Sequence, residues 1–190
     1  MTAAGEPDMG EQQLILDARA GDDRAFRTLV ERHMRQVYNV AYGLVKDHDE
    51  AEDIAQEVFV KAHAMLSSFR GEAGFGTWIY RITLNASFNG LQKRKRRAGH
   101  TVDLMNEAVA NIGASDEHVE SAEHRSLIER ALHELPTLQR AVIILRHMEG
   151  LSTRQVSQIL RCSEGTVKTH LFRGLKKMRS KLDFLYEGKG

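Results

Sequence analysis

The chain has 190 residues, with 27 Lys and Arg against 26 Asp and Glu and a net charge of +1. This length fits one large or two small domains. The low content of proline (2 residues) and of aromatic residues (6%) favours helices. A single cysteine excludes an internal disulfide bond. We find no signal peptide and no apolar run long enough to span a bilayer, and therefore expect a cytoplasmic protein.

The charge is segregated along the chain. Residues 1–92 hold 9 basic against 14 acidic residues, and residues 93–97 are all basic. Residues 98–124 hold six acidic residues and no Lys or Arg, whereas residues 125–190 hold 13 basic against 6 acidic residues. Two basic regions therefore flank an acidic spacer, a pattern that offers two separate footprints for phosphate.

The apolar residues of the first half repeat at helical spacing. They predict long amphipathic helices over residues 25–45 and 51–62, and a third over residues 77–91. The second helix and the residues before it are acid-rich on one side and apolar on the other. Docking of a partner and a merely solvated face are both open for this acidic side.

A glycine-rich aromatic segment runs from Phe69 to Ile82. It holds the only tryptophan and three glycines within six residues. Such a loop lets backbone approach a base closely, Phe and Tyr rings can stack on unpaired bases, and Arg70 and Arg81 can contact phosphates. A core role is also open for Phe75, Trp78 and Ile82, and it is at least equally open for Trp78 and Ile82, which share a helical face.

Residues 99–121 have weak periodicity and no basic residue, and they predict a mobile linker. Pro136 stands where a helix can begin, and the apolar residues over 137–147 predict a brace for the segment that follows.

Residues 150–173 are typical of a helix-turn-helix. Ser152 and Gln155 have capping-box spacing, so a helix should begin there and bury Val156, Ile159 and Leu160. Ser163 can cap a second helix, which should bury Val167, Leu171 and Leu175 and turn Lys, Thr and Arg side chains toward DNA. An ordinary helical hairpin with a basic face is the alternative. Cys162 lies in the turn, where a packing role and a redox role are both open.

Several motifs together resemble a known family. They are the acidic segment from Asp49 to Phe59, the run from Phe69 to Asn85, and Leu135-Pro136 with Arg140 before the helix-turn-helix. In this order and spacing they resemble an extracytoplasmic-function (ECF) sigma factor of bacterial RNA polymerase, over roughly residues 12–182. Gly74 and Gly76 make the loop looser than in many members.

The resemblance implies an all-α fold of two small helical domains joined by a flexible acidic linker. The second sigma domain would span residues 12–97, the linker 98–121, and the fourth sigma domain, with the helix-turn-helix, 122–184. It further implies a transcription initiation factor that recognises promoter elements, melts DNA and regulates a stress or envelope response. No enzymatic activity, catalytic residue, cofactor, metal or small-molecule substrate is expected.

The resemblance also implies site residues. Contact with the minus-thirty-five element would come from Arg154, Gly165, Thr166, Lys168, Thr169, Phe172, Arg173 and Lys176. Recognition and melting of the minus-ten element would come from Phe69, Arg70, Gly71, Phe75, Tyr80, Arg81, Asn85, Lys93, Arg94, Arg96 and Arg97. The loop would form the pocket for a flipped base, because unstacking a base costs a few kcal/mol that a preformed pocket must offset.

The expected partners are promoter DNA, core RNA polymerase and an anti-sigma factor. On the polymerase, the clamp helices of the largest subunit would receive Asp49, Glu52, Asp53, Gln56 and Glu57, and the flap of the second-largest subunit is a further contact. The acidic linker would thread toward the RNA path. The anti-sigma factor could hold the protein at the inner membrane.

Two other classes of protein fit the sequence less well. A two-component or quorum-type regulator needs a receiver or sensing domain, and the N-terminal half shows no alternating strand and helix pattern. A helical di-metal enzyme is suggested by nine histidines and the acidic cluster over residues 47–57, but no Glu has a His three residues later. Metal analysis of the purified protein distinguishes this enzyme from the other classes.

Overall fold

The computed structural model describes residues 9–71, 73–97 and 121–183, and these residues form helices and turns without any strand. The predicted all-α fold is confirmed. The acidic linker expected over residues 98–121 lies outside the described residues, except for Ser121, which begins a helix.

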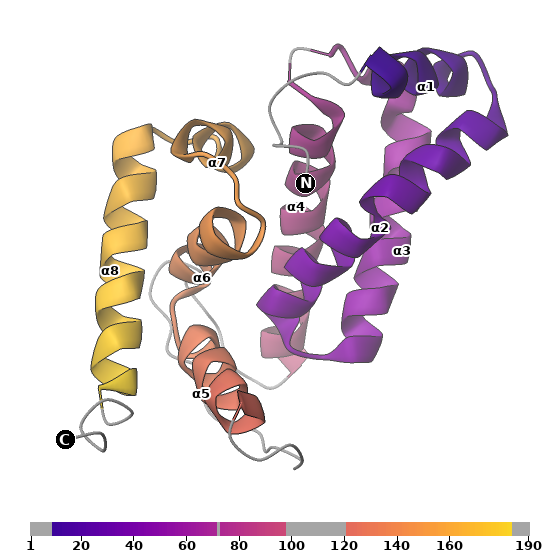
Figure 1. Cartoon of the computed structure of the whole chain (residues 1–190). Helices are drawn as coiled ribbons and strands as arrows, with labels where there is room; N and C mark the ends of the chain where they lie inside the picture. Colours follow the sequence, from indigo (N-terminus) through magenta and orange to yellow (C-terminus); the bar gives the residue numbers. More distant parts are fainter. Residues whose placement is uncertain (1–8, 72, 98–120, 184–190) are drawn as a thin grey trace.

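The first half of the chain forms an N-terminal bundle of four helices (Figure 1). These are α1 (Met9–Arg19), α2 (Asp23–Val45), α3 (His48–Met65) and α4 (Phe75–Arg97). A short 3-10 turn, Leu66–Ser68, follows α3. Helix α4 continues beyond the predicted end near residue 91 and carries the basic run on its last turns. Helix α1 was not predicted, because its apolar residues do not form a strong stripe.

The second half forms a C-terminal bundle, in which α6 and α7 lie between α8 and the N-terminal bundle (Figure 1). Its helices are α5 (Ser121–His133), α6 (Thr137–Ile143), α7 (Thr153–Leu160) and α8 (Glu164–Leu182). Helix α6 passes directly into a π-helical turn, Ile144–Met148, so the predicted brace over residues 137–147 is one continuous rod.

Helix starts are fixed by side-chain caps, as the sequence predicts. The Ser152 backbone N–H donates to Gln155 Oε1 at 2.8 Å, and the Gln155 N–H donates to Ser152 Oγ at 3.2 Å, which completes the capping box of α7. Ser163 Oγ accepts from the Thr166 N–H at 3.0 Å at the start of α8. These caps satisfy amide groups that have no partner inside the helix, so the two helices begin at defined residues.

The buried face of α8 differs from the prediction. Val167 is buried and Leu171 is partly buried, but Leu175 is 41% exposed. Gly174 is buried instead, because a period of 3.6 residues brings residue 174 rather than residue 175 back to the same side. A Cβ atom on Gly174 would lie 2.8 Å from Ile143 Cδ1, so α8 packs closely on α6.

One hydrophobic core runs through both bundles. In the N-terminal bundle it includes Leu29, Val40 and Val58, and in the C-terminal bundle it includes Leu135 and Val156. Contacts of α4 with α7 and of α2 with α6 join the two bundles directly.

Candidate promoter and polymerase interfaces

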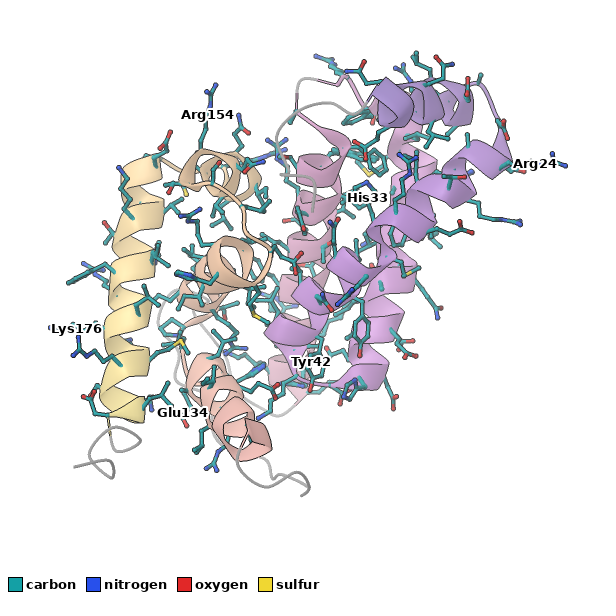
Figure 2. All side chains as sticks on the ribbon, in the orientation of Figure 1. Arg24, His33, Tyr42, Glu134, Arg154 and Lys176 are labelled. Carbon is teal, nitrogen blue, oxygen red and sulfur yellow. The ribbon has the colours of Figure 1, made fainter. Side chains whose placement is uncertain are left out.

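The α8 surface is the part of the molecule expected to meet the minus-thirty-five element. Gly165, Lys168, Thr169, Arg173 and Lys176 are all exposed on this helix, and the Phe172 ring is 69% exposed. Arg154 is exposed on α7, and Figure 2 shows Arg154 and Lys176 pointing away from the rest of the molecule. Thr166 is partly buried and its hydroxyl bonds to Ser163 Oγ at 2.9 Å, so it helps to hold the helix start.

The loop expected to capture a base is built on an aromatic cluster. Phe75 is 1% exposed, and its ring centroid lies 5.8 Å from that of Phe69 and 5.5 Å from that of Trp78. Because Phe69 is buried too, these rings form the base of the loop rather than a free stacking surface. Arg70 and Gly71 are exposed, and Gly71 has φ +71°, a left-handed conformation that glycine adopts without strain.

His33 supports this aromatic cluster from α2, a role that the sequence did not reveal. Its Nε2 lies 2.7 Å from Glu11 Oε1 on α1, and its Nδ1 lies 3.0 Å from Gln36 Oε1. Its ring centroid is 5.2 Å from that of Phe75, and Figure 2 places His33 on the inner side of α2. Helix α1 therefore steadies the loop through His33.

Two α4 residues expected to act on the minus-ten element are engaged with the C-terminal bundle. Tyr80 is 3% exposed, and its hydroxyl donates to Glu149 Oε2 at 2.9 Å. Burial, with the nearby Glu149 carboxylate, raises the pKa of Tyr80. Arg81 Nε donates to the Gln158 carbonyl oxygen at 3.1 Å. Asn85, one helical turn further on, is exposed.

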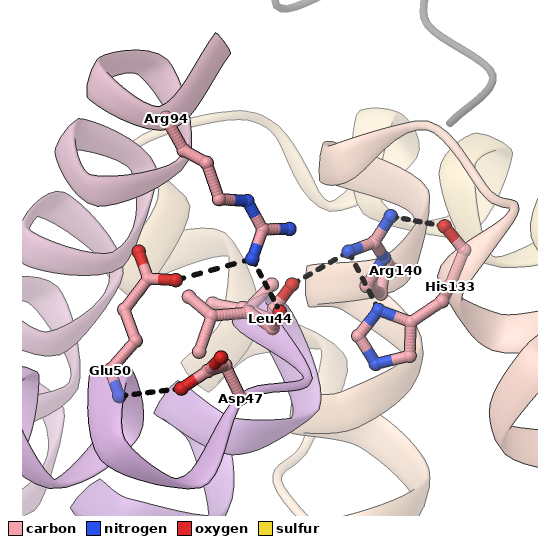
Figure 3. Close-up of polar contacts among 7 residues, drawn as sticks. Leu44, Asp47, Glu50, Arg94, His133 and Arg140 are labelled. Carbon is pink, nitrogen blue, oxygen red and sulfur yellow. Dashed lines mark hydrogen bonds and ion pairs between the residues drawn. The ribbon is translucent and has the colours of Figure 1, made fainter. Parts of the chain in front are cut away.

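The basic run at the end of α4 is mostly exposed, and Arg94 is tied to the bundle. Lys93, Arg96 and Arg97 are exposed. Arg94 Nη1 lies 3.3 Å from Glu50 Oε2 and 3.4 Å from the Val45 carbonyl oxygen (Figure 3). Arg94 therefore bridges α4 to the end of α2 and the start of α3.

The acidic side of α3 is free of the bundle. Asp49, Glu52, Asp53, Gln56 and Glu57 are exposed, whereas the opposite side of the helix is buried. Glu57 pairs with Lys61 one turn later. Val60, which follows Gln56 by one turn, is 70% exposed and extends this face with an apolar side chain.

Arg140 is a buried cation with several hydrogen-bond partners. It is 3% exposed and donates to the carbonyl oxygens of Leu44 at 2.6 Å, of Leu135 at 3.1 Å, and of His133 (Figure 3). It also lies 3.2 Å from His133 Nδ1. One side chain thus joins α5, α6 and the last turn of α2.

The contact between Arg140 and His133 leads us to expect that the stability of the fold falls in acid. Burial, reinforced by Arg140, Lys46 and Arg94, lowers the pKa of His133 to about 3. Below about pH 6.5 the unfolded chain takes up a proton that the folded chain does not, so stability falls as the pH falls. We expect a loss of at most about 2 kcal/mol between pH 6.5 and pH 5, measured by urea unfolding.

Replacing His133→Asn keeps an acceptor for Arg140 and removes the titrating ring, so it should flatten this acid dependence. His147→Asn, at an exposed position, should leave it unchanged. The same acid dependence in the wild type and in His133→Asn would contradict the assignment.

Neither a metal site nor a reactive thiol emerges from the described residues. No group of three or more His, Cys, Asp or Glu there could hold a metal ion. Cys162 is partly buried, and burial raises the pKa of its thiol, which leaves less of the reactive thiolate at neutral pH. Nor is any helix of residues 9–71, 73–97 and 121–183 both long and apolar enough to cross a membrane.

Comparison with known proteins identifies the family. Residues 29–97 match the family model Sigma-70 region 2, and residues 125–178 match Sigma-70, region 4. The ECF RNA polymerase sigma-E factor of Haemophilus influenzae is 34% identical over 181 residues, which cover 90% of this chain and 95% of that protein. The chain belongs to the ECF sigma factors. The RNA polymerase sigma-H factor of Pseudomonas aeruginosa is 33% identical over 172 residues, which cover 86% of this chain and 89% of that protein.

Solved structures of sigma factors share the fold. CnrH in complex with the cytosolic domain of CnrY superposes with a TM-score of 0.70 at 25% identity, covering 92% of this chain and 97% of that chain. The sigma factor RpoE in complex with the anti-sigma factor NepR from Bartonella quintana gives a TM-score of 0.65 at 25% identity, covering 83% and 96%. As an ECF sigma factor the protein is a transcription initiation factor and not an enzyme, which excludes the di-metal alternative.

Proposed function

We propose that this ECF sigma factor binds core RNA polymerase through the acidic side of α3 and reads a promoter with two separate surfaces. The α8 surface contacts the minus-thirty-five element, and the loop with α4 captures and melts the minus-ten element. The genes that it controls belong to a stress or envelope response. The clamp helices of the largest subunit receive α3, and the flap of the second-largest subunit contacts the C-terminal bundle.

The observation that carries this proposal is the α8 surface. A capped helix start with exposed Gly165, followed by Lys168, Thr169, Phe172 and Arg173 on accessible sides, supplies the groups that DNA recognition needs. Arg and Lys can bond to guanine O6 and N7, Thr can bond to a base or phosphate, and an aromatic ring can contact a thymine methyl group. The backbone N–H groups at the helix start can hold a phosphate.

At the minus-ten element, different exposed residues of the N-terminal bundle contact the phosphates and the bases. Arg70 and the basic residues Lys93, Arg96 and Arg97 follow phosphates, and Asn85 supplies an amide for a base edge. The buried rings of Phe69 and Phe75 hold the loop in shape, which a preformed base pocket requires.

An anti-sigma factor is the proposed regulator. The sigma factor RpoE from Bartonella quintana is described in complex with the anti-sigma factor NepR, and its fold matches 83% of the length of this chain. A membrane-anchored anti-sigma factor would hold the protein at the inner membrane, away from the polymerase.

Reconstituted holoenzyme and a set of single-base promoter variants test the α8 assignment. Arg173→Ala should cost about 1 to 3 kcal/mol at one preferred base pair of the minus-thirty-five element, because it removes a bidentate base contact. Lys176→Ala, the matched control on the same helix, should weaken binding to every variant alike, as loss of a phosphate contact does. Equal losses on all variants for Arg173→Ala would make it a phosphate contact as well.

A further inference from the structure

The loop that is proposed to capture a base of the minus-ten element is open at two of its glycines. We call the described residues of this segment, 69–71 and 73–75, the minus-ten loop. A Cβ atom built on Gly71 or on Gly74 would meet nothing within 4 Å, so the bundle does not press on the loop at these positions. Because glycine also restricts the backbone less than other residues do, the shape of the loop depends on how its two ends are held.

The first end of the minus-ten loop is held by the 3-10 turn after α3 and by α1. The Phe69 N–H donates to the Leu66 carbonyl oxygen at 3.1 Å. Arg19, at the end of α1, donates from Nη2 to the Ser67 carbonyl oxygen at 3.4 Å. Helix α1 crosses the end of the N-terminal bundle at which α4 begins (Figure 1). It is therefore placed to reach both ends of the loop.

The second end of the minus-ten loop is held through His33 on α2. His33 Nε2 lies 2.7 Å from Glu11 Oε1, and a carboxylate can only accept, so His33 is the donor. The other ring nitrogen, Nδ1, lies 3.0 Å from Gln36 Oε1. The ring centroid is 5.2 Å from that of Phe75, and a Cβ atom on Gly76 would lie 3.8 Å from its Cε1 atom. Glu11 and Gln36 thus fix the ring against the first two residues of α4.

The aromatic cluster joins the two ends of the loop. The Phe69 ring centroid lies 5.8 Å from that of Phe75 and 5.0 Å from that of Trp78. Phe75 and Phe69 are both buried, and His33 is only 8% exposed. Since a close-packed interior transmits strain, a shift of the His33 ring displaces Phe75 and, through it, Phe69.

We propose that α1 is a positioning element of the minus-ten base pocket, and that Glu11 and His33 determine base selectivity there without touching DNA. This inference rests on the proposed function where it assigns base capture to the loop. A pocket discriminates between bases only when its groups are held in place, whereas phosphate contacts add affinity without sequence information. Loss of the bond between Glu11 and His33 therefore lowers discrimination between minus-ten bases more than it lowers overall affinity.

Glu11→Ala tests this role, because it removes the acceptor of His33 while alanine preserves the helix. The measurement is binding of reconstituted holoenzyme to labelled single-stranded minus-ten oligonucleotides that differ at one base. We expect the ratio of affinities for the preferred and the replaced base to fall by about fivefold. Discrimination at the minus-thirty-five element should not change. Glu11→Gln keeps an acceptor and should retain the ratio, as should the matched control Gln12→Ala at the exposed neighbouring position.

A double-mutant cycle tests whether Glu11 acts through His33. His33→Phe keeps a ring against Phe75 but cannot bond to Glu11. If the bond carries the effect, Glu11→Ala, His33→Phe and the double variant should all lose the same discrimination, because the second change removes nothing further. Additive losses would show that the two residues act separately, and would overturn the coupling.

The fluorescence of Trp78 gives a readout that needs no DNA. Trp78 is the only tryptophan of the chain and lies within the aromatic cluster. Acrylamide should quench it more strongly in Glu11→Ala and in His33→Phe than in the wild type, because a looser cluster admits the quencher. Arg19→Ala should give a smaller increase, since the Arg19 side chain is exposed. Gln12→Ala should give none, and circular dichroism should show the same helix content in every variant.

Unchanged quenching in Glu11→Ala would overturn the role of α1 in holding the loop. Stronger quenching with unchanged discrimination between minus-ten bases would overturn the role in selectivity, and so would equal losses of discrimination at the two promoter elements. A wild-type holoenzyme that does not discriminate between minus-ten bases would instead contradict the proposed function, while the quenching result would still decide whether α1 holds the loop.

Discussion

Replacing Asp53→Lys together with Glu57→Lys is expected to abolish competition for core RNA polymerase while the helical fold survives. Both side chains are exposed on the acidic side of α3, opposite the buried stripe that includes Ile54 and Val58. Exposed charges contribute little to stability, within about 1 kcal/mol, although Glu57→Lys also loses its pair with Lys61. Like charges set against a basic partner surface cost several kcal/mol, which is enough to remove binding.

A competition pull-down with core enzyme, beside a circular dichroism melt, measures both effects. The matched control is Asp23→Lys with Glu31→Lys, two exposed acids on α2 that give the same change in net charge. This control should compete as well as the wild type does. If the α3 double variant is folded and still competes at wild-type strength, the acidic side of α3 is a solvated face and not the docking surface.

The second large effect is expected at Arg140. Arg140→Ala leaves three carbonyl groups, those of Leu44, His133 and Leu135, without their charged donor inside the protein. Hydrogen bonds to charged groups contribute about 1.5 to 3 kcal/mol each, and buried acceptors left alone add a desolvation cost. We expect the free energy of unfolding to fall by about 3 to 5 kcal/mol in urea titrations.

Arg94→Ala is the matched control, because Arg94 also reaches a carbonyl at the end of α2 but is exposed (Figure 3). Its loss should cost no more than about 1 kcal/mol. Arg140→Lys should lie between the two, since one ammonium group cannot reach three carbonyl oxygens in the way that a planar guanidinium does. Equally small losses in the free energy of unfolding for Arg140→Ala and Arg94→Ala would show that the buried Arg140 contacts contribute little to stability.

Features fixed by neighbours in the chain could be predicted from the sequence. The capping box of Ser152 and Gln155, the Ser163 cap and the amphipathic stripes of α2 and α3 depend on residues three or four positions apart. The all-α fold follows from these local signals together. Leu175 was misplaced because a four-residue repeat drifts from the helical period, and the error accumulates over two turns.

Burial of the candidate site residues could not be predicted in the same way. Tyr80 meets Glu149 across 69 residues of chain, and Arg81 meets Gln158 across 77. A residue type cannot report such a contact, because tyrosine and arginine suit a nucleic-acid surface and a protein interface equally well. The support that α1 gives to the loop through His33 depends on a further long-range pair, Glu11 and His33.

The close approach of α8 to α6 at Gly174 bears on how promoter preference is set. With only a hydrogen atom between the Gly174 backbone and Ile143, the two helices lie closer than any larger residue would allow. Helix α8 thus contacts α6 through Gly174 on its buried side, while Lys168 and Arg173 are exposed. A methyl group added at Gly174 would press on the Ile143 side chain, so that side chain or α8 itself must shift. If α8 contacts the minus-thirty-five element as proposed, Gly174→Ala can change sequence preference from the inner side of the helix.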